Sequence, residues 1–225
     1  MGSGKFSRRL RRGTIESTAI FLIAQVGAAL AQEPSDGTET SGAAVLDRFV
    51  ENVSSLSADF TQDIWGADKQ LVETAMGKMS LQRPDRFYWH YETPIETIVV
   101  ADGKDLWMYD VELAQVSVTP LADMSGANPA LLLSGERDLR EDFAVDQSYR
   151  LDGEDWVKLT PKQSGTDFSS VLIGFDAGLP SHLELVDGLD QTTRIAFSNV
   201  VVNPQLDASL FEFDPPAGTD VIGTR

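Results

Sequence analysis

The sequence has no cysteine, few histidines and few basic residues, and each shortage excludes a class of function. Without cysteine there is no thiol nucleophile, no disulfide and no N-terminal cysteine that could carry a lipid. The chain has 18 Lys and Arg against 35 Asp and Glu, a net charge of −17 at pH 7. Such a surface repels nucleic acid and anionic lipid headgroups, so we expect neither as a partner.

The motifs of common enzyme and metal sites are missing as well. There is no G-x-S-x-G elbow, no phosphate loop, no G-x-G-x-x-G and no H-E-x-x-H. The two histidines, His90 and His182, lie far apart in the sequence, and most carboxylates lie near turn residues. The sequence therefore predicts a protein that is not an enzyme and has no metal or cofactor. A lipid hydrolase is a disfavoured alternative.

The N-terminus has the three parts of a secretory signal peptide. Basic residues between Lys5 and Arg12 precede an apolar run that ends in Ala29-Leu30-Ala31, a small-x-small cleavage pattern. As a helix the run is about 20 Å long, short of the ~30 Å hydrocarbon core of a bilayer. We expect export to the periplasm and this division of the chain: 1–31, cleaved signal peptide; 32–42, flexible linker; 43–225, a single domain.

Most of that domain has the period-two pattern of β-strands. Ala43 to Val53 has apolar residues at helical spacing, but from Leu56 apolar and polar residues alternate in short segments separated by turn residues. Asp102-Gly103 is typical of a hairpin turn. A final strand is expected to end at Pro215-Pro216. The other strands are predicted at 56–64, 76–81, 87–91, 95–100, 105–109, 111–119, 143–151, 156–161, 168–175, 179–186 and 191–202.

A segment in the middle of the chain, Pro120 to Asp142, breaks this series. It is rich in leucine and contains Gly126, Pro129 and Gly135, which indicates two or three short helices. A sheet of about ten strands must curl strongly or close, and short helices over its mouth would form a lid on an apolar cavity.

Aromatic residues gather on single faces of two of the predicted strands. Phe87, Trp89 and Tyr91 share one face of their strand, whereas Trp107 and Tyr109 lie on the face opposite Met108. Two interpretations stay open on this pattern, an ordinary sheet core and the wall of a cavity for a hydrophobic ligand.

Several motifs resemble those of one family, and they occur in the same order. Arg83-Pro84-Asp85-Arg86-Phe87-Tyr88-Trp89 resembles the R-P-x-x-F-x-W motif of LolA, the periplasmic carrier of outer-membrane lipoproteins. Val100 to Tyr109 is similar to the hairpin of that family, and Phe211 to Gly218 to its C-terminal segment. The resemblance extends from about Leu46 to Ile222.

The resemblance implies a fold and a function. The fold would be an incomplete, strongly curved antiparallel β-barrel of ten to eleven strands, with short helices as a lid over a hydrophobic cavity. The protein would take acylated lipoproteins from an inner-membrane ABC-type releasing complex to a LolB-like outer-membrane receptor, as a monomer. A glycolipid carrier and a lipoprotein-binding stress sensor of the same fold are the alternatives.

The resemblance also implies site residues. Arg83 would hold the lid shut through hydrogen bonds to backbone carbonyls, although pairing with Asp85 on the surface is the alternative for an arginine in this pattern. Phe87 matches a position tied to docking and transfer in the family. The residues expected to contact cargo, in the cavity or the lid, are Phe87, Trp89, Tyr91, Met108, Leu131, Leu132 and Leu133.

Overall fold

The described part of the chain is a single curved β-sheet with one α-helix. The computed structural model describes residues 41–123, 133–134, 143–163 and 168–223. No helix in these ranges is long and apolar enough to cross a bilayer. The elements are α1 (Ser41–Asn52), β1 (Ser55–Trp65), β2 (Leu71–Gln82), β3 (Arg86–Thr93), β4 (Thr97–Asp102), β5 (Asp105–Asp110), β6 (Gln115–Pro120), β7 (Phe143–Leu151), β8 (Glu154–Pro161), β9 (Phe168–Asp176), β10 (Leu179–Asp187), β11 (Thr192–Val202) and β12 (Asp220–Gly223), with 3-10 turns η1 (Leu121–Asp123) and η2 (Ala208–Phe211).

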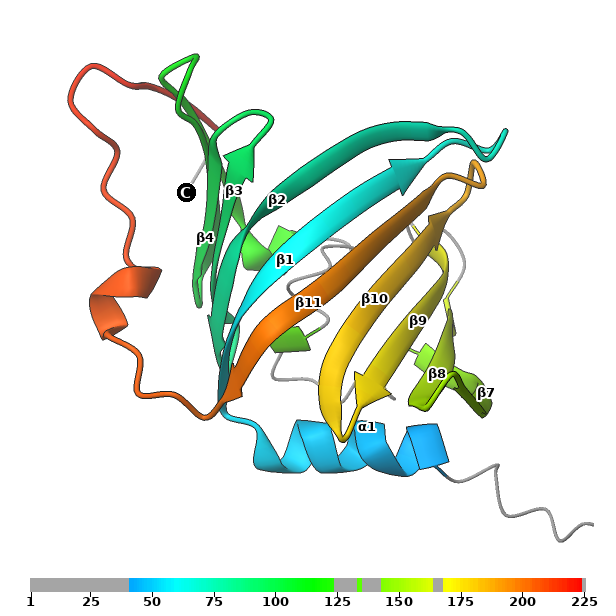
Figure 1. The fold of residues 1–225 in the computed structure, drawn as a ribbon. Helices are drawn as coiled ribbons and strands as arrows, with labels where there is room; N and C mark the ends of the chain where they lie inside the picture. The colour runs from blue at the N-terminus through cyan, green and yellow to red at the C-terminus, as the bar shows by residue number, and fades with distance from the viewer. Residues whose placement is uncertain (1–40, 124–132, 135–142, 164–167, 224–225) are drawn as a thin grey trace, which may run out of the picture. The chain divides into compact units, whose positions relative to one another are not determined.

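The strands form one open sheet in the order β12-β6-β5-β4-β3-β2-β1-β11-β10-β9-β8-β7. Neighbouring strands in this order pair antiparallel, except that β12 joins β6 in parallel. The sheet bends strongly between β4 and β7, with α1 along one end of it (Figure 1). Since β12 and β7 are the two ends of the strand order, this is an incomplete barrel, as the sequence predicts.

The predicted elements are confirmed with changes at their limits. The helix begins at Ser41, slightly earlier than expected, and β2 begins at Leu71. Two predictions at the C-terminus are wrong. The last strand was expected at Phe211 to Phe213, but Phe211 ends the 3-10 turn η2 and the next residues are irregular, and β12 adds a strand that has no alternating pattern. Apart from η1 and 133–134, the helices predicted between Pro120 and Asp142 lie outside the described residues.

The main hydrophobic core lies on the inner face of the sheet. Alternate residues of each strand point to this face, and α1 packs Leu46 and Phe49 against it. The Phe49 ring centroid lies 5.8 Å from that of Phe175 on β9. Gly42 fixes the start of α1, because a Cβ there would overlap the backbone carbonyl of Trp156 on β8. The helix is therefore held against β7 to β9 at both of its ends.

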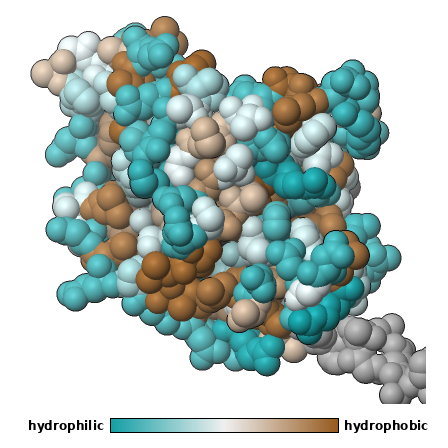
Figure 2. All heavy atoms as spheres, in the orientation of Figure 1, coloured by the Kyte–Doolittle hydropathy of each residue, from teal (hydrophilic) through white to brown (hydrophobic). Residues whose placement is uncertain are grey.

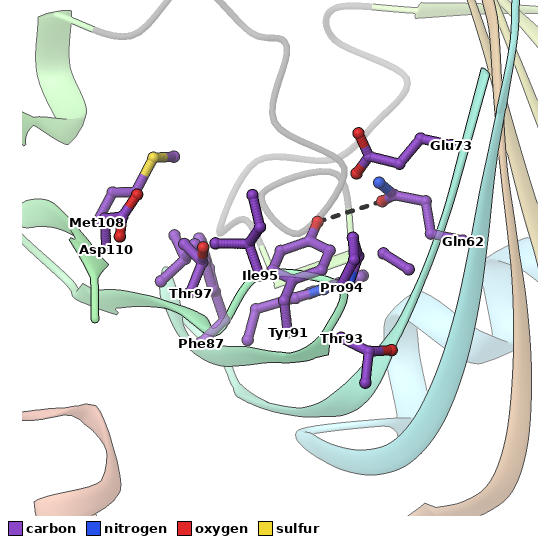
Figure 3. Close-up of a pocket in the computed structure, with 13 residues that line it drawn as sticks. Gln62, Glu73, Phe87, Tyr91, Thr93, Pro94, Ile95, Thr97, Met108 and Asp110 are labelled. Carbon is purple, nitrogen blue, oxygen red and sulfur yellow. Dashed lines mark hydrogen bonds between the residues drawn. The ribbon is translucent and has the colours of Figure 1, made fainter. Parts of the chain in front are cut away.

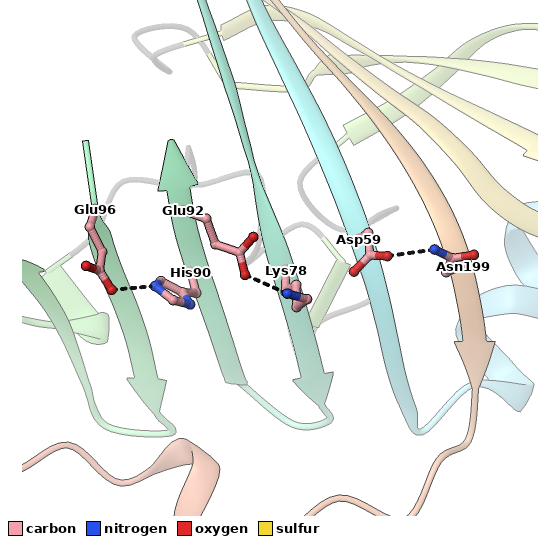
Figure 4. A network of polar contacts seen from close by, with 6 residues as sticks. All are labelled: Asp59, Lys78, His90, Glu92, Glu96 and Asn199. Atoms are coloured by element: carbon pink, nitrogen blue, oxygen red, sulfur yellow. Dashed lines mark hydrogen bonds and ion pairs between the residues drawn. The ribbon is translucent and has the colours of Figure 1, made fainter. Parts of the chain in front are cut away.

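The outer face of the central strands is polar. Asn199 donates to Asp59 at 2.7 Å, Lys78 pairs with Glu92 at 2.6 Å, and His90 contacts Glu96 at 3.0 Å (Figure 4). On the face shown in Figure 2, apolar side chains occur as small groups among polar ones. The strands β1 to β3 thus separate a wet outer surface from an apolar inner one.

A second, smaller core covers the outer face of β4 to β6. Val100, Trp107, Val116 and Val118 pack there, and the ring of Phe213 lies 5.7 Å from that of Trp107. Phe213 belongs to the segment that follows η2, and η2 itself contacts β3 and β4 (Figure 1). Trp107 and Tyr109 therefore belong to a sheet core on the outer face. Of the two interpretations that the sequence left open, ordinary sheet core is the one that holds for these two residues.

Asp102 organises the turn between β4 and β5. Its carboxylate accepts hydrogen bonds from the backbone N–H groups of Lys104 and Asp105, both at 2.8 Å, and from the indole of Trp107 at 3.0 Å. Burial alone would raise the pKa of Asp102, but these donors together hold it below its ordinary value. The hairpin predicted from Asp102-Gly103 is confirmed.

We expect Asp102→Asn to reduce the free energy of unfolding by about 1–2 kcal/mol at neutral pH, since charged acceptors bind these donors more strongly. A carboxyl with a depressed pKa stabilises the fold above its unfolded value of about 3.8 and loses that contribution as the pH falls through the folded value. Urea unfolding at pH 7 and near pH 3 should therefore show the difference from wild type shrinking in acid. Asp190→Asn, in an exposed turn, is the control.

Candidate functional site

A pocket of about 320 Å³ opens on the inner face of the sheet between β1 and β5. Its volume lies at the lower end of the range of small-ligand sites. The side chains that line it come from five neighbouring strands and from the turn between β3 and β4 (Figure 3). They are Gln62, Glu73, Ala75, Phe87, Trp89, Tyr91, Thr93, Pro94, Ile95, Thr97, Val99, Met108 and Asp110.

The back wall of the pocket is aromatic. Phe87, Trp89 and Tyr91 alternate along β3 and so point to the same inner face. Phe87 is fully buried, and the Trp89 ring lies 4.7 Å from that of Phe60 on β1. Tyr91 packs edge-on against Phe60 at 5.2 Å. The structure therefore brings the three predicted aromatic residues together on one surface.

Two apolar side chains of the pocket lining are accessible to solvent. Met108 on β5 is 44% exposed, and Ile95 in the β3–β4 turn is 51% exposed. In Figure 3 Met108 lies beside Asp110 at one end of the row of lining side chains, and Ile95 lies near its middle. Methionine adapts to ligands of irregular shape, and neither side chain makes a fixed polar contact, so this part of the lining suits a flexible hydrocarbon chain.

One polar pair lies inside the pocket. The Tyr91 hydroxyl donates to the Gln62 side-chain oxygen at 3.2 Å, and Gln62 is itself buried. Burial, above all, raises the pKa of the Tyr91 phenol to about 12; the hydrogen bond with Gln62 opposes this and the charge of Glu73 adds to it. The phenol is therefore neutral at physiological pH and serves as a hydrogen-bonding group.

Arg83 lies beside the pocket strands, at the turn between β2 and β3. Its guanidinium donates to the Val50 carbonyl at 2.7 Å and, through Nε and Nη2, to the Leu133 carbonyl at 3.2 and 2.9 Å. It also lies 5.2 Å from the Phe49 ring centroid. Burial lowers the pKa of Arg83, but an arginine remains protonated. These contacts join α1 to Leu133, in place of the surface pair with Asp85 that was the alternative.

The leucines predicted to contact cargo are only partly described. Leu133 is buried at 1% exposure in the main core and is not among the described residues that line the pocket. Leu131 and Leu132 lie outside the described residues. The backbone N–H of Asp85 donates to the Ser134 carbonyl at 3.0 Å, so that the Arg83–Asp85 turn holds residues 133–134 at two points.

The pocket also contains residues that the sequence analysis did not single out. Gln62 interrupts the apolar positions of β1 at an inward-facing site, a signal that was visible in the alternation. Glu73 and Ala75 were missed because β2 was predicted to begin at Met76. Ile95, Thr97 and Val99 could be assigned to the pocket only once the pairing of β4 with β3 was known.

Groups for catalysis or metal binding are scarce near this pocket. Within the described ranges, no cluster of three or more His, Asp or Glu residues has metal-binding geometry. His90 points to the outer face, and His182 stacks on Trp156 at 5.5 Å on a distant part of the sheet. The arrangement can bind and release an apolar group by dispersion and burial.

The fold and this pocket define a class, a curved open sheet with an aromatic-walled pocket on its inner face. The outer membrane lipoprotein carrier protein LolA family model matches residues 51–214. The chain belongs to this family. It is 40% identical over 186 residues to the outer-membrane lipoprotein carrier protein of Nitrosospira multiformis, covering 82% of this chain and 90% of that one.

One further relative agrees with this assignment, and one solved structure shares the fold. The carrier protein of Chromohalobacter salexigens is 42% identical over 198 residues, covering 88% of this chain and 94% of its relative. The crystal structure of an uncharacterized conserved protein from Thermus thermophilus is similar with a TM-score of 0.51. It is 15% identical and covers 80% of this chain and 97% of that chain, which supports the fold alone.

Proposed function

We propose that this protein carries lipoproteins through the periplasm by holding their acyl chains in the pocket on the inner face of the sheet. The observation that carries the proposal is an apolar pocket, aromatic at the back and open at Met108 and Ile95, in a chain of this family. Exposing an acyl chain to water costs roughly 0.8 kcal/mol for each methylene, so it needs an apolar container to cross water.

The finer parts of the proposal concern partners and location. Residues 1–31 direct export and are removed. The cargo comes from an inner-membrane ABC-type releasing complex and goes to an outer-membrane, LolB-like receptor. The protein acts as a monomer, without a cofactor and without catalysing a reaction. The aromatic wall and the sparse polar groups of the pocket support binding over chemistry.

A release assay tests the proposal. The purified protein is incubated with spheroplasts whose inner membrane holds labelled lipoproteins, and the supernatant is separated by size. We expect a soluble one-to-one complex of protein and lipoprotein. Binding of lipid without release of lipoprotein would favour a glycolipid carrier or a sensor instead. If neither binds, carriage is refuted.

Two exposed methionines make a matched pair for this assay. Met108 lines the pocket at 44% exposure, whereas Met76 on β2, at 49%, is not among its described lining residues. Met108→Glu should lower the released lipoprotein about tenfold, because an acyl chain would have to desolvate the new carboxylate. Met76→Glu adds the same charge elsewhere and should release lipoprotein as wild type does. Equal release by both variants would place the cargo outside this pocket.

A further inference from the structure

The described lining of the pocket contains two carboxylates and no basic side chain. Glu73 on β2 and Asp110 at the end of β5 lie at opposite ends of the row of lining residues (Figure 3). An acyl chain that lies along this row therefore has a carboxylate near each of its ends. Dispersion contacts with the aromatic wall depend only on the hydrocarbon part of an acyl chain. Selectivity between ligands with the same hydrocarbon chain must therefore come from the polar end.

Both carboxylates occupy inward-facing positions. Glu73 lies two residues before the buried Ala75, and Asp110 two residues after Met108, on the face that elsewhere in these strands is apolar. Asp110 has a structural task, since it accepts the backbone N–H of Leu113 at 2.9 Å in the β5–β6 turn. Glu73 is exposed at the rim, where water solvates its charge at little cost.

The charge of Glu73 also acts on Tyr91, which lines the same pocket. The phenol is buried among the lining residues, and after its burial and the opposing bond to Gln62, the charge of Glu73 further raises its pKa. A phenolate at Tyr91 would be an anion inside the pocket, as the head of an anionic ligand would be. The same repulsion acts on any carboxylate or phosphate brought into the pocket.

We propose that the pocket accepts acyl groups whose polar end is uncharged and discriminates against those that end in a carboxylate or phosphate, with Glu73 as the main determinant. This inference rests on the proposed function and specifies its ligand. Acyl chains joined through neutral ester or amide groups are accepted. Free fatty acids and anionic phospholipids are rejected, so the carrier does not fill with these membrane lipids.

Calorimetric titration of the purified protein with decanamide and with decanoate at neutral pH and low salt tests the proposal, because the two ligands share one hydrocarbon chain. We expect decanamide to bind about tenfold more tightly. Glu73→Gln should reduce that ratio to about threefold, by strengthening decanoate binding more than decanamide binding. Added salt should narrow the wild-type ratio, since the rim is accessible to ions.

Glu112→Gln is the matched control, since Glu112 is an exposed glutamate of the β5–β6 turn that is absent from the described lining. It removes the same charge and should leave the ratio at its wild-type value. Equal affinities of the two ligands for the wild type, or equal effects of both substitutions, would overturn the selectivity alone. If decanamide does not bind at all, both the selectivity and the proposed carriage are overturned.

Discussion

Arg83→Leu is expected to leave the sheet folded while freeing residues 133–134 from α1, and to impair lipoprotein transfer. The substitution removes three hydrogen bonds from a charged donor to the Val50 and Leu133 carbonyls. Such bonds contribute roughly 1.5–3 kcal/mol each, offset by the cost of burying the guanidinium, so we expect a net loss of about 2–4 kcal/mol. A domain of this size tolerates that loss.

Hydrogen exchange is the measurement that separates this effect from general unfolding. Amides near the end of α1 and at residues 133–134 should exchange faster in Arg83→Leu, while those of β9 and β10 keep their protection. Transfer of labelled lipoprotein to outer membranes should fall in parallel. Faster exchange over the whole sheet would instead mean that Arg83 supports the entire fold.

Two variants of the same turn serve as controls. Arg83→Lys keeps the charge but not the planar fork that contacts two carbonyls, so an intermediate effect is expected. Arg86→Leu removes an exposed arginine three residues away and should behave as wild type. If Arg83→Leu transfers lipoprotein at the wild-type rate, the proposed role of Arg83 in transfer is refuted, whatever the exchange data show.

The contacts of Arg83 illustrate what sequence patterns predict and what they omit. The resemblance implied an arginine that binds backbone carbonyls, but the identity of the carbonyls depends on tertiary packing, which brings Val50 and Leu133 to Arg83 from distant parts of the chain. No local pattern encodes such a contact. By contrast, the side-chain direction of Phe87, Trp89 and Tyr91 follows from strand periodicity alone.

The C-terminus and the pocket rim also contain features that the sequence did not predict. β12 was missed because its four residues are all exposed and therefore show no alternation; its pairing with β6 is set by the chain path after η2. Glu73 was missed because β2 extends past the segment in which its alternation is visible. Long amphipathic strands were predictable, whereas exposed strand ends and edge strands depend on their partners.

Phe87→Glu is expected to destabilise the whole fold, not merely to block transfer. Phe87 is fully buried between Leu81 of β2 and Ala101 of β4, and the described pocket lining offers no basic partner for a carboxylate. An unpaired buried charge costs about 3–5 kcal/mol. For a chain of this length, that lowers the melting temperature by roughly 10 °C or more, which calorimetry would measure.

Phe87→Leu is the control that separates fold from function at this position. It keeps the site apolar and should cost less than about 1.5 kcal/mol, so the variant folds and its transfer can be measured. Since the Phe87 side chain has no exposed surface, it cannot dock a partner directly in this conformation. A role in transfer must then act through the pocket wall, and Phe87→Leu should weaken decanamide binding and transfer together. Reduced transfer with unchanged decanamide binding would instead favour a docking role, which requires a conformation that exposes this ring.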